Sequence, residues 1–182
     1  SSREIIQNKM NRNLKSESFT ISDLKITASV ELKDIYSRAA NVIGKIISRN
    51  HKYRDEFVII GAHFDHLGYG GPGSGSLKPD TNAVHNGAND NASGAAGLLE
   101  LAHKLQENRK LLKRSVLFIA FDAEEKGLLG SKYFVQNPTI NIKNVSAMIN
   151  MDMIGKMRDS TIIIGGVGTS PVFEPILDSL AI

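Results

Sequence analysis

Hydrophobic residues in this chain gather in short runs separated by polar segments. Three runs, Glu56–Ala62, Val116–Phe121 and Val145–Asn150, predict strands buried within a sheet. The segments Asn41–Ile47 and Thr161–Ile164 predict two further strands. All five runs lie in the part of the chain after residue 40, which is therefore expected to contain the core.

Helical patterns alternate with these strands. Residues 92–108 predict a helix with Leu98, Leu101 and Leu105 on one face, and a second helix is predicted over about 128–135. Pro171–Leu180 begins like a third helix. Strands that alternate with helices in this way predict an α/β layer sandwich with a largely parallel centre.

The first part of the chain has a different pattern of hydrophobic and polar residues. Residues 1–23 are polar and show no clear period, so we interpret them as a linker or the remnant of an upstream region. From residue 24 apolar residues alternate with polar ones. This pattern predicts a half-buried strand, with its buried face formed by Leu24, Ile26, Ala28, Val30 and Leu32. The domain boundary is therefore predicted between residues 23 and 24.

Composition narrows the classes of protein. With 182 residues, 41% hydrophobic and 23% charged, the chain suits one globular domain. Its net charge is only +3 and its basic residues are scattered, so no nucleic-acid partner is expected. It has no run of 18 apolar residues to span a membrane, and no cysteine for disulfides or thiolate metal sites. No signal peptide is visible.

Two short motifs are set aside. Gly68–Gly73 matches the glycine pattern of dinucleotide sites, but no helix can open there, so residues 68–87 are predicted to be a functional or mobile loop. Asn91 and Asn144 each begin a glycosylation acceptor pattern, which we interpret as coincidence.

Ionisable side chains follow each predicted buried strand. In a parallel sheet the carboxyl ends of the strands share one edge, where sites form. Four separate segments are thus expected to bring their side chains together at one edge: His63, Asp65 and His66; Asp90; Asp122, Glu124 and Glu125; and Asp152.

These acidic groups would repel one another strongly. Two like charges about 4 Å apart cost roughly 4 kcal/mol at an effective dielectric constant of about 20. A bound cation removes this cost, and His63 beside carboxylates is the mixed nitrogen and oxygen donor set that suits zinc. Asp65 is placed to accept the other ring N–H of His63. The pattern therefore predicts a zinc site.

Four sequence blocks resemble the co-catalytic di-zinc aminopeptidases, a family that includes relatives of glutamate carboxypeptidase. They occur in the family's order between about residues 39 and 155: GAHFDHLG from Gly61, NGANDNASG from Asn86, DAEEKGLLGSKYF from Asp122 and NMDMIG from Asn150. The resemblance implies a three-layer sandwich with a mixed, centrally parallel sheet. Residues 24–182 would then form the N-terminal part of a zinc peptidase catalytic domain.

The resemblance also implies a role for each matching residue. His63 and Asp152 would bind one zinc, Glu125 a second, and Asp90 both. Glu124 would be the general base that takes a proton from the attacking water, and Asp65 would orient His63. The Asp90–Asn91 peptide bond is expected to be cis. Peptide substrates and an extracytoplasmic location are implied too, and an upstream protease-associated domain would be compatible.

One family ligand has no counterpart. The pattern requires a downstream histidine on the second zinc, but no histidine follows His103. We therefore expect a fragment of a larger enzyme that is catalytically poor by itself. As substitutes, His66 is predicted to make a loop hydrogen bond and His85 to support the loop or contact substrate. His51 and His103 are predicted to be structural or exposed.

Two alternatives stay open at the level of sequence. One is a single-zinc enzyme similar to glutaminyl cyclases, and the other is a non-catalytic binding module on the same fold. Clustered charges argue against the module, because an inactive domain has no physical need for them. The residues concerned are His63, Asp90, Glu124, Glu125 and Asp152. Side-chain preference, amino- against carboxypeptidase activity and oligomeric state are left open.

Overall fold

The computed structural model describes residues 2–16, 18, 22, 24–34, 36–157 and 159–180 of the chain. They divide into two compact units, with the division between Ser37 and Arg38. Each unit is described by itself. The boundary predicted between residues 23 and 24 stays a prediction.

Among its described residues, the first unit contains one helix, α1 (Ser2–Asn13). It lies in the segment that we interpreted as a linker without periodicity. Six of its twelve residues, among them Glu4, Gln7 and Met10, have good intrinsic helix propensity, which favours a helix even without an apolar face. Propensity rather than burial explains this helix.

The strand predicted from the alternation over residues 24–32 is wrong. This segment contains no strand, and its apolar side chains are exposed, with Leu32 at 88%. Alternation shows that a segment could present one apolar face, but a strand also needs a neighbour for its backbone hydrogen bonds. The described residues of the first unit supply no such neighbour.

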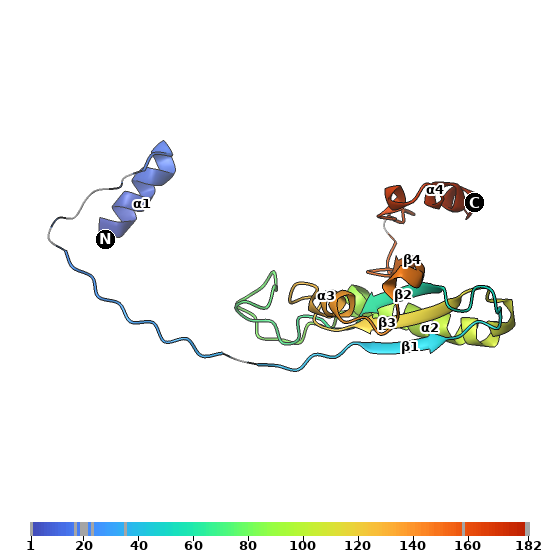
Figure 1. Cartoon of the computed structure of the whole chain (residues 1–182). Helices are drawn as coiled ribbons and strands as arrows, with labels where there is room; N and C mark the ends of the chain where they lie inside the picture. The colour runs from blue at the N-terminus through green and yellow to red at the C-terminus, as the bar shows by residue number, and fades with distance from the viewer. Residues whose placement is uncertain are drawn as a thin grey trace. The chain divides into compact units, whose positions relative to one another are not determined.

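The second unit is built on one four-stranded sheet (Figure 1). Its strands are β1 (Val42–Ile46), β2 (Phe57–His63), β3 (Ser115–Phe121) and β4 (Val145–Asn150), in the order β1-β3-β2-β4. β2 runs parallel to both β3 and β4, and β1 pairs antiparallel with β3. The prediction of a mixed, centrally parallel sheet is confirmed.

Helices cover both faces of the central strands. On one face, Ile60 and Phe118 pack with Leu98 of α2 (Ser93–Glu107). On the other, Ile59 and Ile119 pack with Phe134 of α3 (Leu129–Gln136). The apolar runs of β2 and β3 are continuous because both of their faces are buried, and the result is the predicted three-layer sandwich.

The buried face of α2 differs slightly from the prediction. Leu98, Ala102 and Leu105 belong to the core cluster, whereas Leu101 is exposed. Spacings of four and three residues keep the first three on one side of a helix, and Leu101 is rotated away from that side. The small Ala102 therefore occupies a core position that we had assigned to a leucine.

β4 is less buried than its sequence predicted. It pairs with β2 on one side, and its side chains Met148 and Ile149 are exposed. The strand predicted over Thr161–Ile164 is wrong, because only Thr161 makes a β-bridge, residues 162–164 lie in no strand, and Ile163 is 92% exposed. A run of β-branched residues favours a strand only where a sheet edge receives it.

The remaining elements are short. In the described part of the chain they comprise a π-helical turn at Ala88–Ala92, 3-10 turns at Arg109–Leu111, Ile142–Asn144 and Val167–Thr169, and the predicted C-terminal helix, α4 (Phe173–Leu180). Residues 68–87 form a loop, as predicted, in which Gly70 and Asn82 make an isolated bridge. Among the described residues, no helix is long and apolar enough to cross a membrane.

Truncation of the core residue Ile119 to Ala is expected to lower the free energy of unfolding by about 3 kcal/mol, because this side chain is 0% exposed in the central strand β3. Ile163→Ala removes the same atoms from an exposed side chain and should change stability by less than about 0.5 kcal/mol. Urea unfolding of both variants measures the difference. Equal losses would contradict the core assignment.

Candidate metal centre

Four segments bring ionisable side chains to one edge of the sheet. His63 is the last residue of β2, Glu124 and Glu125 lie in the turn after β3, and Asp152 lies two residues beyond β4. Asp90 lies in the turn before α2. The parallel strands place their carboxyl ends together, so the edge expected from the sequence is the one at which these residues meet.

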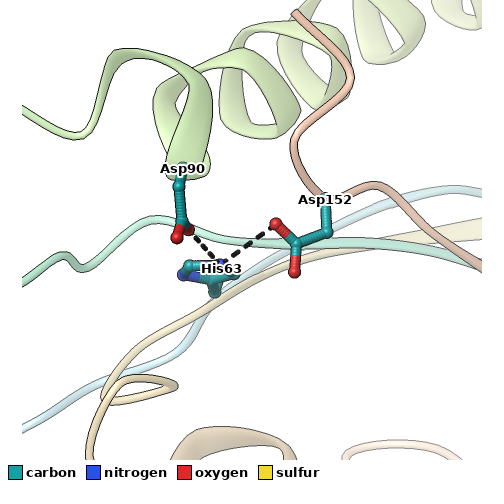
Figure 2. A group of neighbouring side chains, drawn as sticks. All are labelled: His63, Asp90 and Asp152. Carbon is teal, nitrogen blue, oxygen red and sulfur yellow. Dashed lines mark ion pairs between the residues drawn. The ribbon is translucent and has the colours of Figure 1, made fainter. Parts of the chain in front are cut away.

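The side chain of His63 is the centre of the group. It is 3% exposed, and its Nε2 lies 3.2 Å from Asp90 Oδ1 and 3.5 Å from Asp152 Oδ1. Figure 2 shows the two carboxylates reaching the imidazole from separate segments, one at the start of a helix. Glu124 Oε2 is farther away, at 4.0 Å from the same nitrogen.

These separations suit a shared cation. Two ligands of a tetrahedral zinc, each about 2.0–2.1 Å from the ion, lie roughly 3.3 Å apart. The distances of 3.2 and 3.5 Å from His63 Nε2 to the two aspartates bracket this value. The donor set of one imidazole and two carboxylates is also one that zinc accepts, so His63, Asp90 and Asp152 fit the ion.

Asp65 holds the surrounding backbone. Its own carbonyl oxygen lies 3.1 Å from His63 Nδ1, whereas its carboxylate Oδ1 is 3.7 Å away. The hydrogen bond that we predicted for the carboxylate is thus made by the backbone of the same residue. The carboxylate instead accepts the backbone N–H groups of Glu124, at 2.9 Å, and Glu125, at 3.2 Å. It therefore fixes the turn that carries both glutamates.

Glu124 lies in an electrostatically unfavourable place. Partial burial raises the pKa of its carboxyl group above the ordinary value of 4.5, and the negative charges of Glu125, Asp152 and Asp65 raise it further. His63 acts in the opposite direction. A carboxyl group with a raised pKa accepts a proton more readily near neutral pH, which is a property of general bases.

Glu125 forms a second group with His66 and Asp90. His66 Nδ1 lies 2.6 Å from Glu125 Oε1, clearly less than the roughly 3.3 Å between two ligands of one zinc. We therefore assign this contact as a hydrogen bond, in line with the loop hydrogen bond predicted for His66. His85 packs edge-on against His66, with 6.3 Å between ring centroids.

Small residues allow the segments to approach closely. A Cβ on Gly87, whose φ is +61°, would lie 2.8 Å from the carbonyl oxygen of Asp90 and 2.9 Å from His66 Cβ. A Cβ on Gly94 would collide with the side chain of Asn91 and the carbonyl of Met151. The Asp90–Asn91 peptide bond is cis, as the resemblance implied.

An apolar pocket lies beside His63. It has a volume of about 270 Å³, and Glu124 and Asp152 contribute to its wall together with Phe121, Leu128 and Met148. Asp122, which also follows β3, lines the same pocket, but its carboxylate accepts the backbone N–H groups of Ala40 and Ala123, each at 2.8 Å. The pocket is thus lined by both charged and apolar side chains.

Residues 41–182 match Peptidase family M28. The chain belongs to this family. It is 34% identical over 114 residues to a "Probable zinc metalloprotease" of Phaeosphaeria nodorum, covering 59% of this chain and 23% of that protein. It is 33% identical over 130 residues to "Aminopeptidase YwaD" of Bacillus subtilis, covering 70% and 25% respectively.

Among solved structures, this M28 chain is similar to BSAP, a zinc aminopeptidase from Bacillus subtilis, with 33% identity and a TM-score of 0.46. The match covers 63% of this chain and 24% of that structure. The chain spans about a quarter of the length of the curated relatives named above.

Sequence reasoning missed several contacts of the M28 site. It did not identify Asn91 as a buried residue of the site or find the bond of His66 to Glu125. The hydrogen bonds from the backbone N–H groups of Glu124 and Glu125 to the carboxylate of Asp65 were missed as well. The first of these had a signal, since Asn91 lies inside the NGANDNASG block, but its partners become visible only when the loop after β4 folds against it.

Glu124→Gln is expected to raise the melting temperature of the metal-free chain at pH 7, because the ionised carboxylate is disfavoured in the fold. Its folded pKa lies above the unfolded value, so the penalty is absent below about pH 4 and grows as the pH rises through the folded pKa. Thermal unfolding between pH 4 and 8 measures it.

The matched control is Glu100→Gln, an exposed residue on α2, which should leave the melting temperature unchanged across the same range. A lower melting temperature for Glu124→Gln than for the unmodified chain at pH 7 would contradict the electrostatic account.

Proposed function

We propose that this M28 chain carries the zinc centre of an aminopeptidase that hydrolyses peptide bonds. The observation that carries the proposal is the position of His63 Nε2, 3.2 Å from Asp90 and 3.5 Å from Asp152, which matches the spacing of zinc ligands. A probable zinc metalloprotease and an aminopeptidase among the relatives support the same activity.

His63, Asp90 and Asp152 would hold one zinc ion. When bound, zinc polarises the scissile carbonyl and lowers the pKa of a coordinated water. His63 is kept in the required orientation by its Nδ1 contact with the carbonyl of Asp65. Asp90 faces Glu125 and His66 as well, so we assign Asp90 as the ligand shared with a second ion that Glu125 would also bind.

Glu124 is our candidate general base. Its carboxylate lies 4.0 Å from His63 Nε2 and lines the pocket beside the site. It would accept a proton from the attacking water and deliver it to the nitrogen of the leaving amine. The water oxygen bonds to the carbonyl carbon, the C–N bond breaks, and the proton completes the new amine. No other proton donor is required.

One observation favours a second candidate, a single-zinc enzyme similar to glutaminyl cyclases. The 2.6 Å contact between His66 and Glu125 is a hydrogen bond, so the second group has fewer side chains free to ligate than the first. In this alternative the chain binds one zinc and the reaction is cyclisation. Zinc stoichiometry and the product formed distinguish the two candidates.

Zinc titration tests the metal centre. We expect Asp90→Asn and His63→Gln each to weaken zinc binding by at least about a hundredfold, because each removes a ligand and outer partners alone contribute tenfold or more. Competition with a chromophoric chelator measures the affinity and the number of ions. His103→Gln, an exposed histidine on α2, should bind zinc like the unmodified chain. Retained affinity in Asp90→Asn would contradict the assignment.

The role of Glu124 is tested separately from metal binding. Glu124→Gln should leave zinc affinity within about threefold while lowering peptide hydrolysis about 10²–10⁴-fold, the usual contribution of a general base. Aminoacyl-nitroanilide substrates report turnover by the whole protein that contains this sequence, and an N-terminal glutaminyl peptide reports cyclisation. Undiminished hydrolysis by the variant would exclude Glu124 as the base.

A further inference from the structure

We propose that Asn91 is a positioning residue that sets the separation of Asp90 and Asp152. This inference rests on the proposed zinc centre, in which both aspartates are ligands. Asn91 follows Asp90 directly in the chain, and it is 1% exposed. A polar side chain so completely buried requires hydrogen-bond partners, and those partners reveal its role.

The amide of Asn91 holds the backbone on both sides of Asp152. Its Nδ2 donates to the carbonyl oxygen of Met151 at 3.0 Å, and its Oδ1 accepts the N–H of Met153 at 3.2 Å. The residues bonded are the immediate neighbours of Asp152 in the chain. A single rigid, planar group therefore spans the aspartate on the loop after β4.

The same oxygen also connects to the helix. Asn91 Oδ1 accepts the N–H of Gly94, in the first turn of α2, at 3.0 Å. Because Gly94 has no side chain, nothing obstructs the space in which the amide meets the carbonyl of Met151. The side-chain amide of Asn91 is therefore bonded both to the first turn of α2 and to the loop after β4.

The loop around Asp152 needs such a restraint. Met153 has a φ of +53°, in the left-handed region that residues with a Cβ adopt at a cost. Asp152 itself is outside the strand, so no sheet hydrogen bond of its own fixes it. The N–H of Met151 donates to the carbonyl of Gly61 at 2.9 Å, but this bond precedes Asp152 in the chain. Without the bonds from Asn91, we expect the carboxylate of Asp152 to leave the 3.5 Å distance from His63.

Asparagine suits this position because it offers one donor and one acceptor. Aspartate has the same shape but only acceptors when ionised, so Asn91→Asp would place an oxygen against the carbonyl of Met151. The two bonds accepted from Met153 and Gly94 would remain possible. The substitution therefore removes one bond and leaves the volume unchanged.

The test is the zinc affinity of the Asn91→Asp chain, measured by chelator competition. We expect it to fall about tenfold to a hundredfold, the usual effect of losing a partner that orients a ligand. The matched control is Asn89→Asp, which adds the same charge in the same turn and keeps the oxygen that accepts the N–H of Gly155 at 3.1 Å. Its zinc affinity should not fall. Equal affinities for the two variants would overturn the proposal.

A double-mutant cycle separates positioning from a general structural effect. If Asn91 acts through Asp152, then Asn91→Asp should change zinc affinity by less than about threefold once Asp152 has been replaced by Asn. A loss as large as in the original background would show that Asn91 merely stabilises the fold, and it would overturn the positioning role.

A measurement on the unmodified chain keeps the proposal testable if Asn91→Asp does not fold. Without zinc, the amide of Met153 should exchange its hydrogen slowly, because it donates to Asn91 although it lies outside the sheet. Exchange at the rate of an unstructured amide would overturn the proposal. A chain that binds no zinc yet protects this amide would instead refute the proposed function.

Discussion

The main constraint on the site is electrostatic repulsion. The sheet brings several acidic groups together around the buried imidazole of His63. The carboxylates of Asp90 and Asp152 both face His63, and Glu124 Oε2 lies 4.0 Å from His63 Nε2. Each pair of like charges about 4 Å apart costs roughly 4 kcal/mol at an effective dielectric constant of about 20. Burial raises the pKa of Glu124, and the negative charges of Glu125, Asp152 and Asp65 raise it further. The proposed zinc ion would remove most of this repulsion.

Backbone hydrogen bonds resist this repulsion where the strands end. The carboxylate of Asp65 holds the turn that carries Glu124, and the amide of Asn91 holds the loop that carries Asp152. Neither side chain needs to touch a metal. Both shape the site by accepting or donating to the main chain, which ties the positions of the charged groups to the rigid sheet rather than to mobile side chains.

The sequence predicted the central elements well because burial leaves a clear pattern. The runs that became β2 and β3 are apolar except at their ends, since helices cover both of their faces. Prediction failed for the strand over residues 24–32 and for Thr161–Ile164, where a suitable pattern has no neighbouring strand. For α1 the error was the reverse: we expected no regular structure, because the segment has no hydrophobic periodicity, yet a helix forms there. Intrinsic helix propensity favours it.

The amino-acid sequence by itself determined which chemical groups end each strand, and hence that His63 and Asp152 would meet, because parallel strands share their carboxyl edge. Asp90 joins them from the turn that precedes α2. Only the tertiary structure decided the distances between them and the partners that hold them. Asn91 and Met151 are 60 residues apart, and the bond of His66 to Glu125 joins residues 59 positions apart. Such contacts depend on how loops pack after the sheet has formed, and no local pattern encodes that packing.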